Sequence, residues 1–508
     1  MTIASSLLGG PSFLRSDTLI QNREQLDDLN RQLATGERAT TYGGLGSDRV
    51  QSISLRADIS RLEAYQSNID VLAVRVDLTV LALDRLEEIR IEARDVVDPN
   101  NFIDLGNGET FTQQAAENFF LESVALLNSQ TDGRYIFGGD NVLTQPVDTV
   151  EVILDGDGSG AEGLRGVTEE RLRADLGNNG LGRLDTDIDP LTPSTVTLSE
   201  EAATDFGFDI NAVENNLSNV NVTVTGTEPQ SIDVEFTGQP EPEETFRVFL
   251  DLPDGTQEVV ELTAGIPDSF NGSFEIGATP DDTAQNFNAA LRDRLDFTAR
   301  TELNAASRIT TARDFFDTEA GRIPQRVDTV GGTIAPEDAT GLRNATAADT
   351  IFYYNGQNDT DPPREGLQIA VDDTITVNYG LRANEAALRD SLTVLAAFSI
   401  GEFTSGTEQE NQAVHNAFAL RARADLAVQV NQPSVQSVTQ EIAGIQAIAG
   451  NADQRHTAFI NTLDGIREEI ERADPTEVAT QLLSLQTQLE ASFAAASAIS
   501  DLSLVNFL

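Results

Sequence analysis

The chain has 508 residues, with 33 basic residues against 83 acidic ones and a net charge of −50. Every basic residue is Arg, and the absence of Cys excludes disulfides, thiolate metal sites and cysteine nucleophiles. So strong a negative charge repels nucleic acid and anionic lipid alike, and no stretch approaches the roughly 18 apolar residues of a membrane span. We therefore expect neither nucleic-acid binding nor membrane insertion.

The first ten residues do not have the pattern of a secretory signal peptide. They carry no basic side chain and only a short apolar step at Leu7 and Leu8. We expect a chain without a cleaved signal. Export by a route that needs no such signal would leave the same sequence.

The N-terminal part has apolar residues in alternating steps of three and four, the spacing of a coiled-coil seam. We expect a core helix in residues 1–50 and rod helices in 51–149, with Ser52 to Val97 forming a helix of about 70 Å. The expected rod-packing residues here are Ile59, Leu62, Ile69, Val76, Val80 and Leu83.

Residues 150–375 have a different pattern and carry most of the negative charge. Residues 232–236 and 246–250 alternate between apolar and polar side chains as half-buried strands do. Asp254-Gly255, lying between two such runs, predicts a tight hairpin. Residues 281–295 read as one helix with Phe287 and Leu291 on its buried face. We expect an acidic, β-rich projecting part of α+β type, formed by one or two small domains.

The seam spacing returns in residues 376–473, where we expect C-terminal rod helices. Asp474-Pro475 interrupts it, and a C-terminal core helix is expected over 474–508. The expected rod-packing residues of this part are Ile442, Ile445, Phe459, Leu463, Ile466 and Ile470.

The predicted fold class is therefore mixed and mainly α, with long coiled-coil-like terminal helices packed together around a β-rich insert. Few other residues are expected to cover the apolar seams at the two ends of the chain. We therefore expect the helices at these ends to be marginally stable in a monomer and stable in an assembly. The residues of this expected assembly interface are Leu19, Leu26, Leu29, Leu33, Leu482, Leu485, Leu489, Phe493, Ile499, Leu502 and Leu504.

The sequence contains no recognisable group of catalytic residues, and we expect neither enzymatic activity nor a cofactor. His456 lies on the C-terminal seam, where a packing role is expected, and His415 has no metal-binding spacing around it. Residues 155–160 resemble the start of a calcium loop, but Gly166 occupies the twelfth position where Glu is required. A flexible acidic turn is the expected structure there.

Three stretches resemble the flagellin family of bacterial flagellar axial proteins. Residues 29–38, LNRQLATGER, are similar to the N-terminal family segment, with Ala34 in place of the usual Ser. Residues 133–139, GRYIFGG, resemble an element frequent in hook–filament junction proteins. Residues 479–508 resemble the family's C-terminal helix with its apolar tail.

The resemblance implies an extracellular structural protein of the flagellum, exported through the flagellar type III channel. Its implied partners are copies of itself, hook-associated proteins and flagellin, and an export chaperone. We favour the junction subunit because the chain ends in Asn506-Phe507-Leu508, while its length and large insert fit the alternative, a filament flagellin. A coiled-coil adhesin or surface-layer protein is a more distant alternative. An enzymatic insert lacks support because residues 150–375 contain no His for the usual zinc site.

Overall fold

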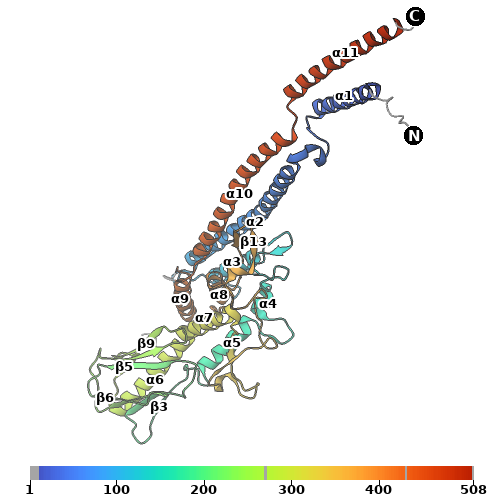
Figure 1. Cartoon of the computed structure of the whole chain (residues 1–508). Coiled ribbons are helices and arrows are strands. Elements are labelled where there is room, and N and C mark those ends of the chain that lie inside the picture. The colour runs from blue at the N-terminus through green and yellow to red at the C-terminus, as the bar shows by residue number, and fades with distance from the viewer. Residues whose placement is uncertain (1–10, 268–271, 429–431, 506–508) are drawn as a thin grey trace. The chain divides into compact units, whose positions relative to one another are not determined.

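The computed structural model describes residues 11–267, 272–428 and 432–505. The chain divides into two compact units. The terminal unit takes its described residues from Met1–Leu72, Ala370–Thr376 and Ala447–Leu508, and the central unit takes its own from Ala73–Ile369 and Val377–Gln446. Two long helices supply residues to both units, α2 (Arg49–Val96) and α10 (Val435–Glu471) (Figure 1).

The terminal unit is helical. Besides its parts of α2 and α10 it contains α1 (Pro11–Thr35), a 3-10 segment at Tyr42–Asp48 and α11 (Pro475–Val505). The course of α2 confirms the long helix predicted from Ser52 to Val97. The predicted interruption at Asp474-Pro475 is also confirmed. Pro475 opens α11, where its missing N–H costs no helical bond, and the Asp474 carboxylate accepts a hydrogen bond from the Thr476 N–H at 2.8 Å.

Within the terminal unit, α2 and α10 run antiparallel. Arg56 on α2 is paired with Glu471 near the end of α10, at 2.6 Å. Further along α2, the Gln66 amide donates to Asp453 at 2.9 Å, nearer the start of α10. Residue numbers rise along one helix as they fall along the other, which is the arrangement of an antiparallel helix pair.

The helical part of the central unit has an aromatic core. Phe316 packs edge-on against Phe120 and Tyr353, with ring centroids 6.3 and 4.7 Å apart, and Phe398 packs against Phe418 at 5.1 Å. The helices that supply or surround these rings are α3 (Phe111–Leu127), α4 (Val150–Asp155), α5 (Leu164–Leu176), α7 (Asn304–Phe316), α8 (Ala386–Ser399) and α9 (Glu408–Asp425).

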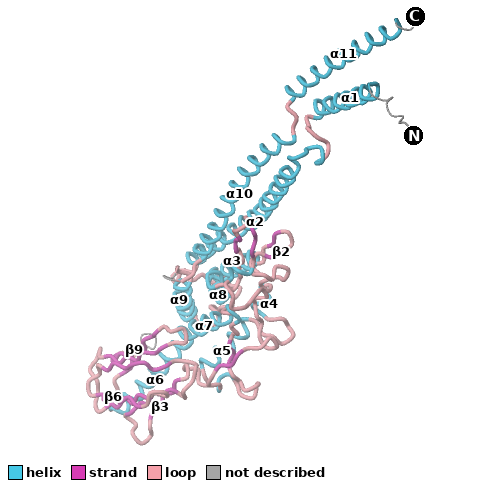
Figure 2. Tube along the Cα trace, viewed as in Figure 1, coloured by secondary structure: helices cyan, strands magenta, loops and turns pink. Residues whose placement is uncertain are grey.

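Two four-stranded sheets and helix α6 (Pro280–Thr298) form a further part of the central unit (Figure 2). One sheet has the strand order β3-β4-β7-β6 and is antiparallel throughout. The other has the order β10-β9-β8-β5, in which β10 pairs parallel to β9. Their strands are β3 (Leu184–Ile188), β4 (Thr195–Glu200), β5 (Asp209–Asn215), β6 (Val220–Thr225), β7 (Ser231–Phe236), β8 (Thr245–Asp251), β9 (Gln257–Gly265) and β10 (Ser273–Glu275).

Phe287 of α6 joins the two sheets into one core. Its ring lies 5.3 Å from that of Phe236 on β7, and 5.2 Å from those of Phe246 on β8 and Phe274 on β10. The rings meet edge to face, the geometry that aromatic quadrupoles favour. The predicted helix over residues 281–295 and its buried face are thus confirmed.

The predicted hairpin is confirmed as well. Residue 251 at the end of β8 pairs with 257 at the start of β9, and the Leu252 N–H donates to the Thr256 carbonyl at 2.8 Å. Gly255 has a φ of 82°, which L side chains rarely adopt. The Asp-Gly pair therefore supplies the turn, as its sequence indicates.

The mixed α and β fold class holds. The strands of the two main sheets occupy only residues 184–275, and α4, α5, α6 and α7 take up much of the remainder of 150–375. The described residues also form short two-stranded pairs, namely β1 (Gln130–Thr131) with β2 (Arg134–Tyr135), β11 (Gln325–Val327) with β12 (Leu342–Asn344), and β13 (Gln368–Ala370) with β14 (Thr376–Asn378).

Candidate assembly surface

The terminal helices α1 and α11 pack together through one apolar cluster. Leu29 of α1 and Val478 and Leu485 of α11 are buried at its centre. Partly buried residues complete the cluster, namely Leu26, Ala473, Leu482 and Leu489. One stripe of each helix is thereby covered.

A second set of apolar side chains on the same two helices stays exposed. On α1, Ile20 is 56 % and Leu33 47 % exposed, and on α11 Leu483 is 63 % and Phe493 62 % exposed. Single exposed apolar residues are ordinary, but these four are the large apolar side chains that the described parts of α1 and α11 leave exposed. This second set is the candidate assembly surface.

The electrostatics of α11 suit close packing. Over 31 residues it carries three acidic side chains, at Glu477, Glu490 and Asp501, and no basic one. Much of its remaining exposed surface is Ala, Ser, Thr and Gln. In a chain of net charge −50, this helix therefore carries little of the negative charge.

A short joint connects the end of α1 to the α10–α11 break. Gly36 follows α1 with a φ of 72° and its carbonyl accepts from the Ala473 N–H at 3.0 Å. Glu37 forms an antiparallel bridge with Arg472, and the Arg38 N–H donates to the Glu471 carbonyl at 2.7 Å. The family-like segment 29–38 therefore supplies one buried cluster residue, a helix end and this joint.

Glu471 ties the joint to α2. Its carboxylate accepts from the Arg56 guanidinium at 2.9 and 2.6 Å and from the Ser52 hydroxyl at 2.6 Å. The bidentate contact with Arg56 lowers the pKa of Glu471 below its usual value. Apolar periodicity gives no signal for this residue, and sequence analysis missed it.

Residues 370–376 form a tip that packs on α2 and α10 within the terminal unit. The buried His456 ring donates from Nε2 to the Val371 carbonyl at 2.8 Å and stacks on Tyr65 with centroids 5.8 Å apart. Arg455 pairs with Asp372 at 2.8 Å, and the Tyr65 hydroxyl contacts Asp373 at 3.0 Å. The predicted packing role of His456 is confirmed, but nothing in the sequence indicated its partner.

The expected assembly residues divide into three groups. Leu26, Leu29, Leu482, Leu485 and Leu489 meet in the α1–α11 cluster. Leu33 and Phe493 are exposed. The side chains of Leu19, Ile499, Leu502 and Leu504 lie outside the described residues.

The expected rod residues are mostly covered within the chain. Buried ones are Ile59, Ile69, Val76, Leu83, Ile442 and Ile445, and half-buried ones are Leu62, Val80, Leu463 and Ile470. Phe459 is 58 % exposed and Ile466 is also exposed, so the expected packing of these two is not met within the single chain. The next covered position after His456 is Ile460 and not Phe459. From Ala452 the covered positions follow two successive steps of four residues, which shifts the seam by one residue from the expected alternation of four and three.

The second family-like stretch, residues 133–139, lies in the central unit. Asp132 and Gly133 both have positive φ and form the turn between β1 and β2. The Phe137 carbonyl then accepts from the Ala383 N–H at 2.9 Å, and the Gly139 N–H donates to Leu381 at 2.8 Å. The stretch thus binds together segments about 240 residues apart in the chain.

The candidates for chemistry have structural roles. His415 is buried against Phe102, Phe398 and Phe403, and burial lowers its pKa. Asp157 accepts from the N–H and hydroxyl of Ser159 at 2.8 and 2.6 Å, which closes an acidic turn rather than a calcium loop. Across the described ranges, no three His, Asp or Glu side chains are grouped to hold a metal ion.

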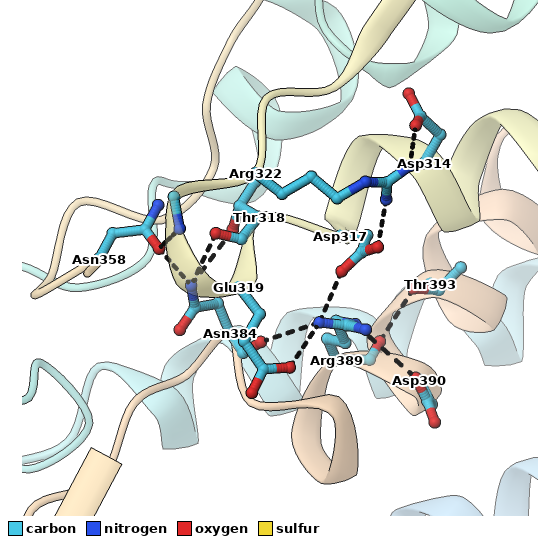
Figure 3. A network of polar contacts seen from close by, with 11 residues as sticks. Asp314, Asp317, Thr318, Glu319, Arg322, Asn358, Asn384, Arg389, Asp390 and Thr393 are labelled. Atoms are coloured by element: carbon cyan, nitrogen blue, oxygen red, sulfur yellow. Dashed lines mark hydrogen bonds and ion pairs between the residues drawn. The ribbon is translucent and has the colours of Figure 1, made fainter. Parts of the chain in front are cut away.

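A polar network links α7 to α8 in the central unit (Figure 3). Asp317 accepts from both Arg322 and Arg389, the latter at 2.8 Å, and Arg389 also pairs with Glu319 at 3.0 Å. Cavities of about 330 and 310 Å³ border this network. Because the arginines and carboxylates are engaged with one another, the network acts as a clasp between two helices.

No protein-family model matches the chain, and no curated protein resembles it significantly. No helix in the described part of the chain is long and apolar enough to cross a membrane.

Proposed function

We propose that the chain is a non-catalytic structural subunit of the bacterial flagellum that assembles through α1 and α11. The observation that carries the proposal is the second apolar set of this helix pair, Ile20, Leu33, Leu483 and Phe493, which the chain itself leaves exposed. Copies stacked around a common axis bury these side chains, with the terminal helices packing as coiled coils. We propose a flagellum as the assembly because three segments of the chain resemble flagellins.

In this proposal the protein is extracellular and leaves the cell unfolded through the flagellar export channel, accompanied by a chaperone. Its partners are further copies and other axial proteins of the flagellum. The hook–filament junction is the favoured position, and the filament itself is the alternative. Long filaments in electron micrographs of the purified chain would favour the filament flagellin, and trimers formed by the ends alone would favour an adhesin.

Leu483→Asp tests the proposal with little risk to folding, because Leu483 lies outside the α1–α11 cluster. We expect the variant to fold and be exported but to fail to assemble, because a charge enters the buried contact between copies. Leu191→Asp is the matched control, since Leu191 is 89 % exposed in the central unit. Sedimentation and electron microscopy give the readout. Assembly of Leu483→Asp at the level of Leu191→Asp would contradict the proposal.

A further inference from the structure

Most edges of the two main sheets are protected against pairing with another strand. The edge strand β3 carries Asp185 and Asp187, and β5 carries Asp209 and Glu214 together with a register shift after Ile210. The remaining edge of the second sheet, β10, has three residues. Charges, bulges and shortness are the devices by which natural sheets prevent edge-to-edge pairing.

The edge strand β6 has none of these devices. Its six residues read Val-Asn-Val-Thr-Val-Thr, without charge, proline or bulge, and it pairs in regular register with β7 alone. Val224 is 46 % exposed, while Val220 and Val222 pack partly against the core. Figure 1 labels β6 and β3, the two edges of this sheet.

The backbone of β6 presents its hydrogen-bonding groups outward at the valines. The Thr237 N–H donates to the Asn219 carbonyl at 2.9 Å, which identifies residues 219 and 237 as a hydrogen-bonded pair. Such pairs alternate along an antiparallel ladder, so Asn221 and Thr223 also bond to β7. The N–H and C=O groups of Val222 and Val224 therefore point to the open edge.

We propose that β6 pairs antiparallel with β6 of a second copy of this chain, around a two-fold axis through Val222. In this register Val222 lies opposite its own counterpart and Val220 lies opposite Val224, all on the core-facing side. Asn221 meets Thr223 on the outer side. The pairing joins two four-stranded sheets into one of eight strands and covers the exposed Val224.

The sequence of β6 favours a second copy over an unrelated strand. Residues 220–224 alternate apolar and polar about Val222, so a two-fold axis places valine beside valine and polar beside polar. A symmetric dimer needs such a self-complementary patch. This inference goes beyond the proposed function, since it involves neither α1 nor α11.

The charge of the chain does not prevent this pairing. The nearest strand charges are Asp233 and Glu235 on the neighbouring strand β7. Two β7 strands in the joined sheet are three strand spacings apart, about 14 Å. Screening at physiological salt acts over about 8 Å, so their repulsion is largely damped.

Cysteine cross-linking of the full chain tests the pairing, because the sequence has no Cys of its own. In the proposed register the Val222 Cα atoms are about 5.5 Å apart, within the range that a disulfide spans. We expect Val222→Cys to form a disulfide-linked dimer on mild oxidation, seen on a non-reducing denaturing gel. Ala212→Cys, an exposed position on the edge strand β5, is the matched control and should stay monomeric.

Introducing a charge gives the second readout. Val224→Lys in the Val222→Cys background should abolish the cross-linked dimer, whereas Ala212→Lys in the same background should leave it unchanged. Dimer formation by Val222→Cys at the level of Ala212→Cys would overturn the proposal, as would a dimer that survives Val224→Lys. The comparison of cross-linked dimer between Val222→Cys and Ala212→Cys tests the pairing even if Val224→Lys lowers the stability of the sheet.

Discussion

Glu471 connects the end of α10 to α2 and to the segment that follows α1 in the terminal unit. Its carboxylate holds Arg56 and Ser52 of α2, and its backbone carbonyl accepts from Arg38 beyond the end of α1. The residue itself is the last of α10, four residues before α11 begins. A seam is recognised by its apolar positions, so the periodicity of the sequence gives no indication of such a polar residue.

Glu471→Gln should lower the free energy of unfolding of the terminal unit by about 1 kcal/mol, since Arg56 is half exposed and solvent screens the pair. The pKa of Glu471 is lowered from 4.5. Its stabilisation is therefore complete above about pH 4.5 and is lost as the pH falls through the lower folded value. Urea unfolding at pH 7 and pH 3 gives the measurement, and a variant with the wild-type pH profile would contradict this role.

His415 makes the stability of the central unit depend on pH in the same direction, but at a higher pH. Burial among phenylalanines lowers the pKa of His415 from 6.5, so the unfolded chain binds the proton first as the pH falls. The stability of the unit should therefore decrease below about pH 6.5. His415→Phe should remove this component while keeping the ring packing. Equal slopes of unfolding free energy against pH, for wild type and variant between pH 7 and 5, would contradict the account.

At the scale of elements, the sequence predicted those structures that a few neighbouring residues determine. The helix α6, the β8–β9 hairpin and the break before Pro475 each follow from a few neighbouring residues. The tip at residues 370–376 could not be predicted, because its contacts with His456 and Arg455 join segments about 80 residues apart. The polar clasp of Figure 3 escaped prediction for the same reason.

Two glycines in the terminal unit should respond in opposite directions to the same change. Gly36→Ala places a side chain at a φ of 72° and should destabilise the α1 end by about 1 kcal/mol. Gly465→Ala, within α10 and with open space around the added Cβ, should stabilise the helix by about 0.5–1 kcal/mol. Thermal unfolding followed by circular dichroism measures both. A stabilising Gly36→Ala would show that the left-handed conformation is not required there.

At the scale of the whole molecule, charge and apolar surface are separated along the sequence. Residues 141–377 carry 14 basic against 45 acidic residues, whereas α11 carries three acidic residues over its whole length. In the proposed assembly, the strongly acidic insert would repel neighbouring copies, whereas the weakly charged α11 would oppose their approach less. Five residues that periodicity assigned to the assembly interface, Leu26, Leu29, Leu482, Leu485 and Leu489, lie in the α1–α11 cluster of the single chain. The sequence did not predict which apolar residues stay uncovered, because that depends on how two helices rotate about each other.

The central claim is that the second apolar set of α1 and α11 becomes buried between copies. Labelling of a single cysteine tests it most directly, with Ala494→Cys beside Phe493 and Leu191→Cys as the reference in the central unit. The account predicts that assembled protein reacts with a thiol reagent far more slowly at residue 494 than dispersed protein does, while residue 191 reacts equally in both. Equal reactivity of residue 494 in assembled and dispersed protein would contradict it.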